Sequence, residues 1–73
     1  MVGNETGDRL RLLIYETGLS IADFALFAGM NRTTVYGYVR GQSEPSLRNL
    51  RILRRSLGSL LGRKIEWHEL LGR

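Results

Sequence analysis

The side chains best suited to contacting a partner lie on a predicted helix at residues 31–40. Asn31 can cap this helix at its start, and Gly41 can end it. Val35 and Tyr38 are three positions apart and are expected to face the core. The helical spacing leaves one exposed side, which carries Arg32, Thr33, Tyr36, Gly37 and Arg40.

Arg32 is the strongest candidate on this side for hydrogen-bond recognition. Its planar guanidinium can bond the O6 and N7 atoms of guanine together, which gives about 1–3 kcal/mol of discrimination between bases. A phosphate contact or a solvated side chain is the alternative for Arg32. Thr33 can bond a base or a phosphate, or lay its methyl group on thymine. Tyr36 can stack along a nucleic-acid backbone or bond a phosphate, with core packing as its alternative.

Gly37 is an unusual residue inside this helix. Glycine in a helix interior costs about 1 kcal/mol relative to alanine. Gly37 offers no side-chain contact, but it would allow a partner to approach the backbone closely.

The charge of the chain favours an anionic partner. Its 73 residues carry a net charge of +4, with a sequence pI near 10.4 and ten Arg against one Lys. Nucleic acid fits this balance, although an arginine-rich soluble surface would give the same composition.

Length and composition also exclude several classes of protein. A chain of this size is one small domain with no room for a catalytic domain, so we do not expect an enzyme or catalytic residues. Cysteine is absent and there is one His, so no metal site is expected. We also expect no cofactor and no small-molecule ligand. No segment approaches the roughly 20 apolar residues that span a bilayer. The sequence therefore predicts a cytoplasmic protein with no membrane contact.

The helices before residue 31 follow from spacing, caps and glycines. Residues 1–7 are small and polar and are predicted to form a flexible arm, and residues 8–73 a single domain. A first helix runs from about Asp8 to Thr17 and stops at Gly18. A second helix, over about residues 20–28, has Ser20 as its N-cap, with Asp23 placed to complete a capping box.

A fourth helix is predicted after Pro45 and ends near Gly62. Its expected core-facing stripe consists of Leu47, Leu50, Leu53, Leu57 and Leu60 or Leu61. The tail beyond it is predicted to be a short extended piece followed by one or two helical turns. Trp67 with Leu70 and Leu71 is either a core plug or a dimer contact.

From Leu19 to Gly58 the sequence resembles the Xre and Cro/C1-type helix-turn-helix family, to whose pattern it aligns without a gap. The matching positions are Leu19, Ser20, Phe24, Ala25, Gly29, Thr34, Val35, Gly41, Pro45, Ser46 and Leu47. The resemblance implies an all-α fold, namely a compact four- to five-helix lambda-repressor-like helix-turn-helix domain. It also implies that the helix at residues 31–40 is a recognition helix that enters the major groove of DNA.

Two departures from the family pattern affect the expected contacts. Ile21 stands where the family often has a Gln that touches the DNA backbone. Ile14 and Val39 stand where the family often buries an Arg against a Glu. Removing one partner of a buried ion pair costs roughly 3–5 kcal/mol, whereas replacing both with packed aliphatic residues is often neutral. The double replacement is therefore consistent with the fold.

The resemblance implies a set of DNA contacts that extends beyond the recognition helix. Its members are Arg32, Thr33, Tyr36, Gly37, Arg40, Gln42, Ser43, Asn31, Ser20 and Arg48. Arg40, Gln42 and Ser43 lie where the family touches phosphates. On the fourth helix, Arg51 could also contact phosphates, while a solvated charged face is the favoured interpretation for Arg54 and Arg55.

The implied function is a sequence-specific regulator of transcription, Cro- or repressor-like, that binds double-stranded DNA. We expect a homodimer on a palindromic operator with half-sites about 34 Å apart. The alternative is a protein-binding helix-turn-helix module, such as an antitoxin or accessory factor. His68 with Glu66 and Glu69 is interpreted as a surface histidine rather than an acid-base or metal site.

Overall fold

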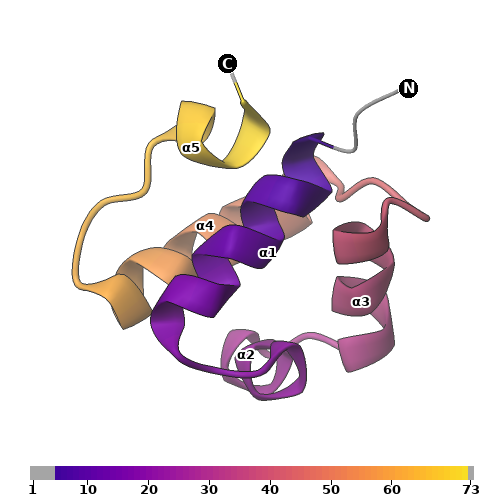
Figure 1. Ribbon diagram of the computed structural model, residues 1–73, viewed down its shortest axis with the longest axis horizontal. Coiled ribbons are helices and arrows are strands. Elements are labelled where there is room, and N and C mark those ends of the chain that lie inside the picture. Colours follow the sequence, from indigo (N-terminus) through magenta and orange to yellow (C-terminus); the bar gives the residue numbers. More distant parts are fainter. Residues whose placement is uncertain (1–4, 73) are drawn as a thin grey trace.

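The computed structural model describes residues 5–72, which form five α-helices and no strand (Figure 1). The helices are α1 (Glu5–Thr17), α2 (Ile21–Ala28), α3 (Arg32–Arg40), α4 (Leu47–Leu61) and α5 (Trp67–Leu71). α1 crosses the middle of the molecule and packs against each of the other four helices. The predicted compact all-α domain is confirmed.

The predicted ends of α2 and α3 are also confirmed. Ser20 caps α2, because its Oγ accepts a hydrogen bond from the backbone N–H of Asp23 at 3.0 Å. Asn31 caps α3, because its Oδ1 accepts from the backbone N–H of Thr33 at 2.8 Å. Gly29 ends α2 with a φ of 70°, in the left-handed region that glycine adopts without strain. These local signals fix the short turn between the two helices.

α1 begins earlier than predicted. It starts at Glu5, so residues 5–7 belong to the helix and not to a flexible arm. The Glu5 carboxylate lies 3.2 Å from the guanidinium of Arg9, a pairing one turn apart that stabilises the first turn. A carboxylate at a helix N-terminus also interacts favourably with the helix dipole. Residues 1–4, the rest of the predicted arm, lie outside the described residues.

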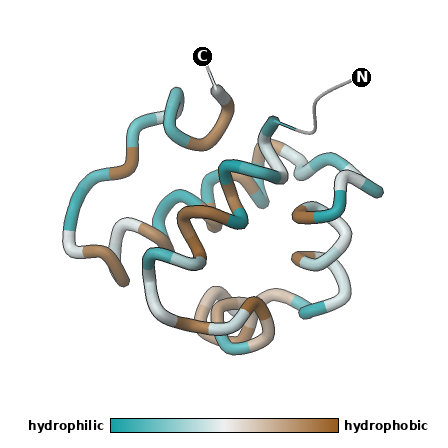
Figure 2. Tube along the Cα trace, in the orientation of Figure 1, coloured by the Kyte–Doolittle hydropathy of each residue, from teal (hydrophilic) through white to brown (hydrophobic). Residues whose placement is uncertain are grey.

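The core consists of apolar side chains from all five helices and from the segment before α5. Its fully buried large residues are Phe24, Leu10, Ile14, Leu53, Leu57, Ile65, Leu70 and Val35. Figure 2 shows apolar and hydrophilic residues alternating along α1, as expected of a helix with one buried face. Ile14 and Val39 are both buried, at 1% and 8% exposure, so neither leaves a charge in the core.

The core-facing stripe predicted for α4 is wrong for its first residue, Leu47. Ser46 caps α4, Leu53 and Leu57 are buried, and Leu50 is partly buried against the core. Leu47, in contrast, is 59% exposed. At 3.6 residues per turn, it lies about 120° around the helix from Leu53, and so on the flank of α4 rather than its inner face.

The tail after α4 is part of the core. It is an extended piece followed by the short helix α5, as predicted, and both Ile65 and Leu70 are almost completely buried. Trp67 is partly buried and packs against the same core. The core-plug interpretation therefore accounts for this segment.

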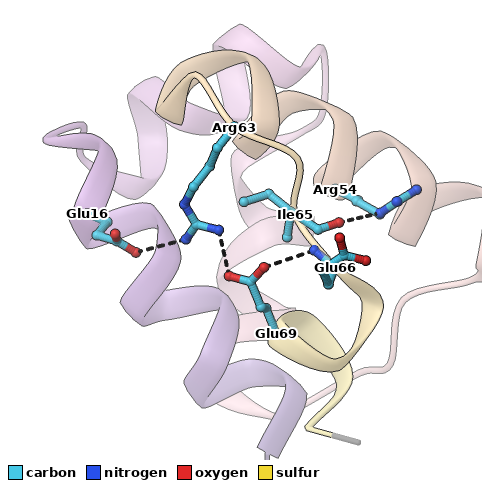
Figure 3. A network of polar contacts seen from close by, with 6 residues as sticks. All are labelled: Glu16, Arg54, Arg63, Ile65, Glu66 and Glu69. Atoms are coloured by element: carbon cyan, nitrogen blue, oxygen red, sulfur yellow. Dashed lines mark hydrogen bonds and ion pairs between the residues drawn. The ribbon is translucent and has the colours of Figure 1, made fainter.

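Polar contacts hold the tail against α1 and α4 (Figure 3). Arg63 donates to Glu69 Oε1 at 2.7 Å and lies 3.8 Å from the carboxylate of Glu16 on α1. Glu69 Oε2 also accepts from the backbone N–H of Glu66 at 2.9 Å. The hydrogen bond from Glu66, followed by that from Arg63, holds the pKa of Glu69 below its usual range.

Candidate nucleic-acid interface

α3 is held in place by its inner side. Val35 is fully buried and Tyr38 is 6% exposed, as the helical spacing predicts. The Tyr38 hydroxyl accepts a hydrogen bond from Asn49 Nδ2 at 2.7 Å, which links α3 to the start of α4. At the other end, the backbone N–H of Met30 donates to the Ala25 carbonyl at 2.9 Å and fixes the turn from α2. The outer side of α3 is therefore presented by a rigid frame.

The outer side begins with Arg32 and Thr33, which are both exposed. They occupy the first two positions of α3, directly after the cap residue Asn31, which is also exposed. In helix-turn-helix proteins, base edges are reached by the N-terminal residues of the second helix of the motif, which corresponds to α3 here. The structure thus leaves these two side chains free to meet a partner.

Tyr36 and Arg40 form a second part of the outer side, one helical turn further along. The Arg40 guanidinium lies over the Tyr36 ring, 5.2 Å from the ring centre. Arg40 is exposed and Tyr36 is partly buried. Such a cation–π contact restrains both side chains while leaving the guanidinium hydrogens available.

Gly37 does not belong to the exposed side, which corrects the prediction. It is buried, because the loop after α3 folds back over it. A Cβ at position 37 would lie 3.1 Å from Ser43 Oγ. The backbone N–H of Gln42 donates to the Gly37 carbonyl at 2.9 Å. The loop, and Ser43 in particular, therefore lies against the face of α3 at Gly37 that was predicted to be exposed.

The remaining predicted contacts surround α3 on neighbouring segments. Gln42 and Ser43 are exposed in the loop that covers Gly37. Ser20 is exposed at the start of α2. Arg48, on the first turn of α4, lines a shallow hollow of about 280 Å³ together with Asn31 and Thr34. The fold thus brings a cation of α4 next to the N-terminus of α3.

The arginines of the described residues fall into two electrostatic groups. Those in ion pairs lie on α1 and in the tail, and are Arg9, Arg11 and Arg63. Those of α3 and α4 form no ion pair with a described residue, and are Arg32, Arg40, Arg48, Arg51, Arg54 and Arg55. The positive charge on α3 and α4 is consequently uncompensated, and it is available to an anionic partner.

Arg54 is a structural residue that the sequence interpretation placed on a solvated face. Its Nε donates to the Ile65 carbonyl at 2.6 Å, and its guanidinium lies 4.7 Å from the centre of the Trp67 ring. It therefore ties α4 to the tail. An aromatic residue in the tail was the one available signal, since arginine often stacks on such rings.

Ile21 packs partly buried against the core. The first residue of α2 thus supports packing, whereas the family often places a DNA-backbone contact there.

Other kinds of site find no support in the part of the chain that the structure describes. His68 is exposed, and no three His, Asp or Glu side chains within residues 5–72 come together as metal ligands. None of the helices in this range has the length and apolar character to cross a membrane.

Comparison with known proteins gives one positive result. A family model described as helix-turn-helix matches residues 9–62, well over half of the chain, and covers α2 to α4 and residues 9–17 of α1. No curated protein and no solved structure matches the chain. The matched region includes every predicted contact residue and ends where the tail begins.

Proposed function

The chain belongs to the Cro/C1-type, Xre-like helix-turn-helix family of DNA-binding regulators, and we propose that it recognises a specific sequence in double-stranded DNA. The observation that supports this most directly is the outer side of α3. Arg32 and Thr33 are exposed at the N-terminus of a helix whose inner side is locked into the core. In this proposal α3 lies in the major groove.

Each predicted contact residue except Gly37 has a role in the proposed complex. Arg32 bonds the O6 and N7 atoms of guanine, and Thr33 contacts the neighbouring base or its phosphate. The stacked pair of Tyr36 and Arg40 follows the DNA backbone. Phosphates are further contacted by residues around α3, namely Ser20, Asn31, Gln42, Ser43 and Arg48. Gly37 has no direct role, because the loop covers it.

The proposed regulator is a Cro-like repressor that acts as a homodimer. One α3 reads only a few base pairs, so two copies are needed to define a site of useful length. A twofold dimer requires a palindromic operator with half-sites about 34 Å apart, one turn of B-DNA.

Binding of random-sequence duplex DNA at increasing salt tests DNA binding itself. We expect binding at low salt and a steep linear fall of log affinity with log salt concentration, because arginine–phosphate contacts release counterions. Absence of binding at low salt would contradict the proposal.

A second candidate is a protein-binding module, such as an antitoxin or accessory factor. It is favoured by large apolar side chains on the surface of α1 and α2, where Tyr15 is 83%, Leu26 80%, Leu12 58% and Phe27 50% exposed. This function predicts a stable complex with a partner protein that forms equally well without DNA. Neither candidate function is enzymatic. We therefore expect the purified protein to show no nuclease or hydrolase activity that depends on His68.

A further inference from the structure

A groove lies between α4 and the tail. It has a volume of about 590 Å³, and its walls carry Leu47, Arg51, Arg54, Arg55, Lys64 and Trp67. These α4 residues belong to one flank of the helix, whereas Arg48, Asn49 and Ile52 line the hollow beside α3. The groove and the hollow beside α3 therefore share no lining residue.

The groove carries positive charge that nothing in the described chain neutralises. Arg51, Arg55 and Lys64 are exposed, and none forms an ion pair with a residue in the range 5–72. Arg54 is held between the Ile65 carbonyl and the Trp67 ring, so its charge is fixed in position.

Apolar surface accompanies these cations. Leu47, at the start of α4, is 59% exposed, and Trp67 is only partly buried. At Gly58, the other end of the groove from Leu47, the tail lies close to α4, as a Cβ there would be 3.0 Å from the Arg63 carbonyl oxygen. The groove thus combines an apolar wall with a cationic rim.

The shape of the groove fits a segment of protein chain. It follows α4 from Leu47 to Gly58, about 16 Å at the helical rise of about 1.5 Å per residue. That length corresponds to about five residues of extended peptide. A small molecule would remain largely solvated there, since the lining residues Leu47, Arg51, Arg55 and Lys64 are themselves exposed.

We propose that this groove binds an acidic peptide segment of a partner protein, with carboxylates on Arg51, Arg55 and Lys64 and an apolar side chain against Leu47 and Trp67. The argument is charge complementarity together with the apolar wall. A second copy of this chain is a poor occupant. Its net charge is +4, and the carboxylates of its α1 already lie beside Arg9, Arg11 and Arg63. The proposal does not depend on the DNA-binding function.

Trp67 is the only tryptophan in the chain, so its fluorescence reports on the groove directly. The probe is a synthetic peptide of alternating glutamate and leucine, long enough to span the groove. We expect a saturable change in Trp67 emission. A matched peptide with glutamine in place of every glutamate should bind at least about tenfold more weakly, because the attraction is electrostatic.

Charge-reversal variants locate the binding site. Arg51→Glu and Arg55→Glu should each weaken peptide binding about threefold to tenfold. Lys64→Glu, outside any helix, should do the same without altering α4. Arg11→Glu is the matched control, since it makes the same charge change on α1 and should leave the affinity within about twofold. Circular dichroism verifies that each variant is folded.

Four results of the binding experiments would overturn the proposal, and a fifth concerns self-association. They are an unchanged Trp67 emission, equal binding of the glutamine peptide, equal loss of affinity in Arg11→Glu, and a Trp67 response to duplex DNA that the groove variants abolish. The last result would make the groove a second nucleic-acid surface. Self-association of the free protein that Arg51→Glu abolishes would assign the groove to a second copy and would equally refute an acidic partner segment.

Discussion

At the scale of single residues, neighbours decide what each arginine does. Arg32 is exposed at the start of α3, whereas Arg54 is bonded to the Ile65 carbonyl and stacked on Trp67. Both are arginines on the polar side of an amphipathic helix, so helical spacing predicts exposure for both. The exposure of Arg32 could be predicted because the residues around it are its neighbours in the sequence. The partial burial of Arg54 could not be predicted, because Ile65, to which it is bonded, is eleven residues further along the chain.

Arg32→Ala and Arg48→Ala should weaken DNA binding in different ways. Loss of Arg32 should cost about 1–3 kcal/mol on a preferred site and relax the preference at one base pair, because it removes a bidentate base contact. Loss of Arg48 should weaken binding to all sequences alike and reduce the salt slope by about 1, because it removes a phosphate contact. Titration of both variants against preferred and scrambled duplexes makes the comparison. Identical losses on the two duplexes for Arg32→Ala would contradict its role in base readout.

At the scale of the elements, the helices were predictable because their ends are encoded locally. Ser20, Asn31 and Ser46 cap three helices, and glycines at left-handed φ end them. Gly37 was predicted wrongly because the loop after α3 covers its face, and helical periodicity does not say where a loop runs. Leu47 was predicted wrongly although periodicity already places it about 120° around α4 from Leu53.

Two helical glycines should respond in opposite ways to alanine. At Gly37 the added Cβ meets the Ser43 hydroxyl at 3.1 Å, and this side chain can rotate away. Gly37→Ala should therefore gain helix propensity and raise stability by up to about 1 kcal/mol. At Gly58 the Cβ meets a backbone carbonyl at 3.0 Å, so Gly58→Ala should lower stability by displacing the tail. Thermal unfolding of the two variants tests this, and a stabilised Gly58→Ala would show that the tail packs differently.

The tail also gives a pH-dependent contribution to stability. Because the pKa of Glu69 is lower in the folded state, its charged form stabilises the fold above the unfolded pKa of about 4.3. This contribution is lost as pH falls through the lower folded pKa. Glu69→Gln should thus melt below the wild type at neutral pH, and the difference should vanish in acid. A difference in melting temperature that persists at the lowest pH would refute this linkage.

At the scale of the whole molecule, charge is distributed unevenly. The ion pairs lie on α1 and the tail, while α3 and α4 keep uncompensated arginines. The net charge of +4 could be taken from the sequence, but its location could not, since pairing depends on the folded arrangement. The uncompensated arginines lie on two surfaces, since Arg48 lines the hollow beside α3 whereas Arg51 and Arg55 line the groove between α4 and the tail.

The assembly on DNA is predicted to contain two chains per duplex. Sedimentation of the protein with a preferred site measures this stoichiometry directly. Two chains on a symmetric duplex, and a large loss of affinity when one half-site is scrambled, are expected of a homodimer. One chain per duplex with undiminished affinity would contradict the dimer.

Selection of bound sequences from a random duplex pool tests the central claim most directly, because it asks whether α3 reads bases. The wild type should enrich one symmetric motif that contains a guanine in each half. Arg32→Ala should enrich the same motif without the preference for that guanine. Recovery of sequences with no common motif, or the same guanine preference in Arg32→Ala, would contradict recognition by the start of α3.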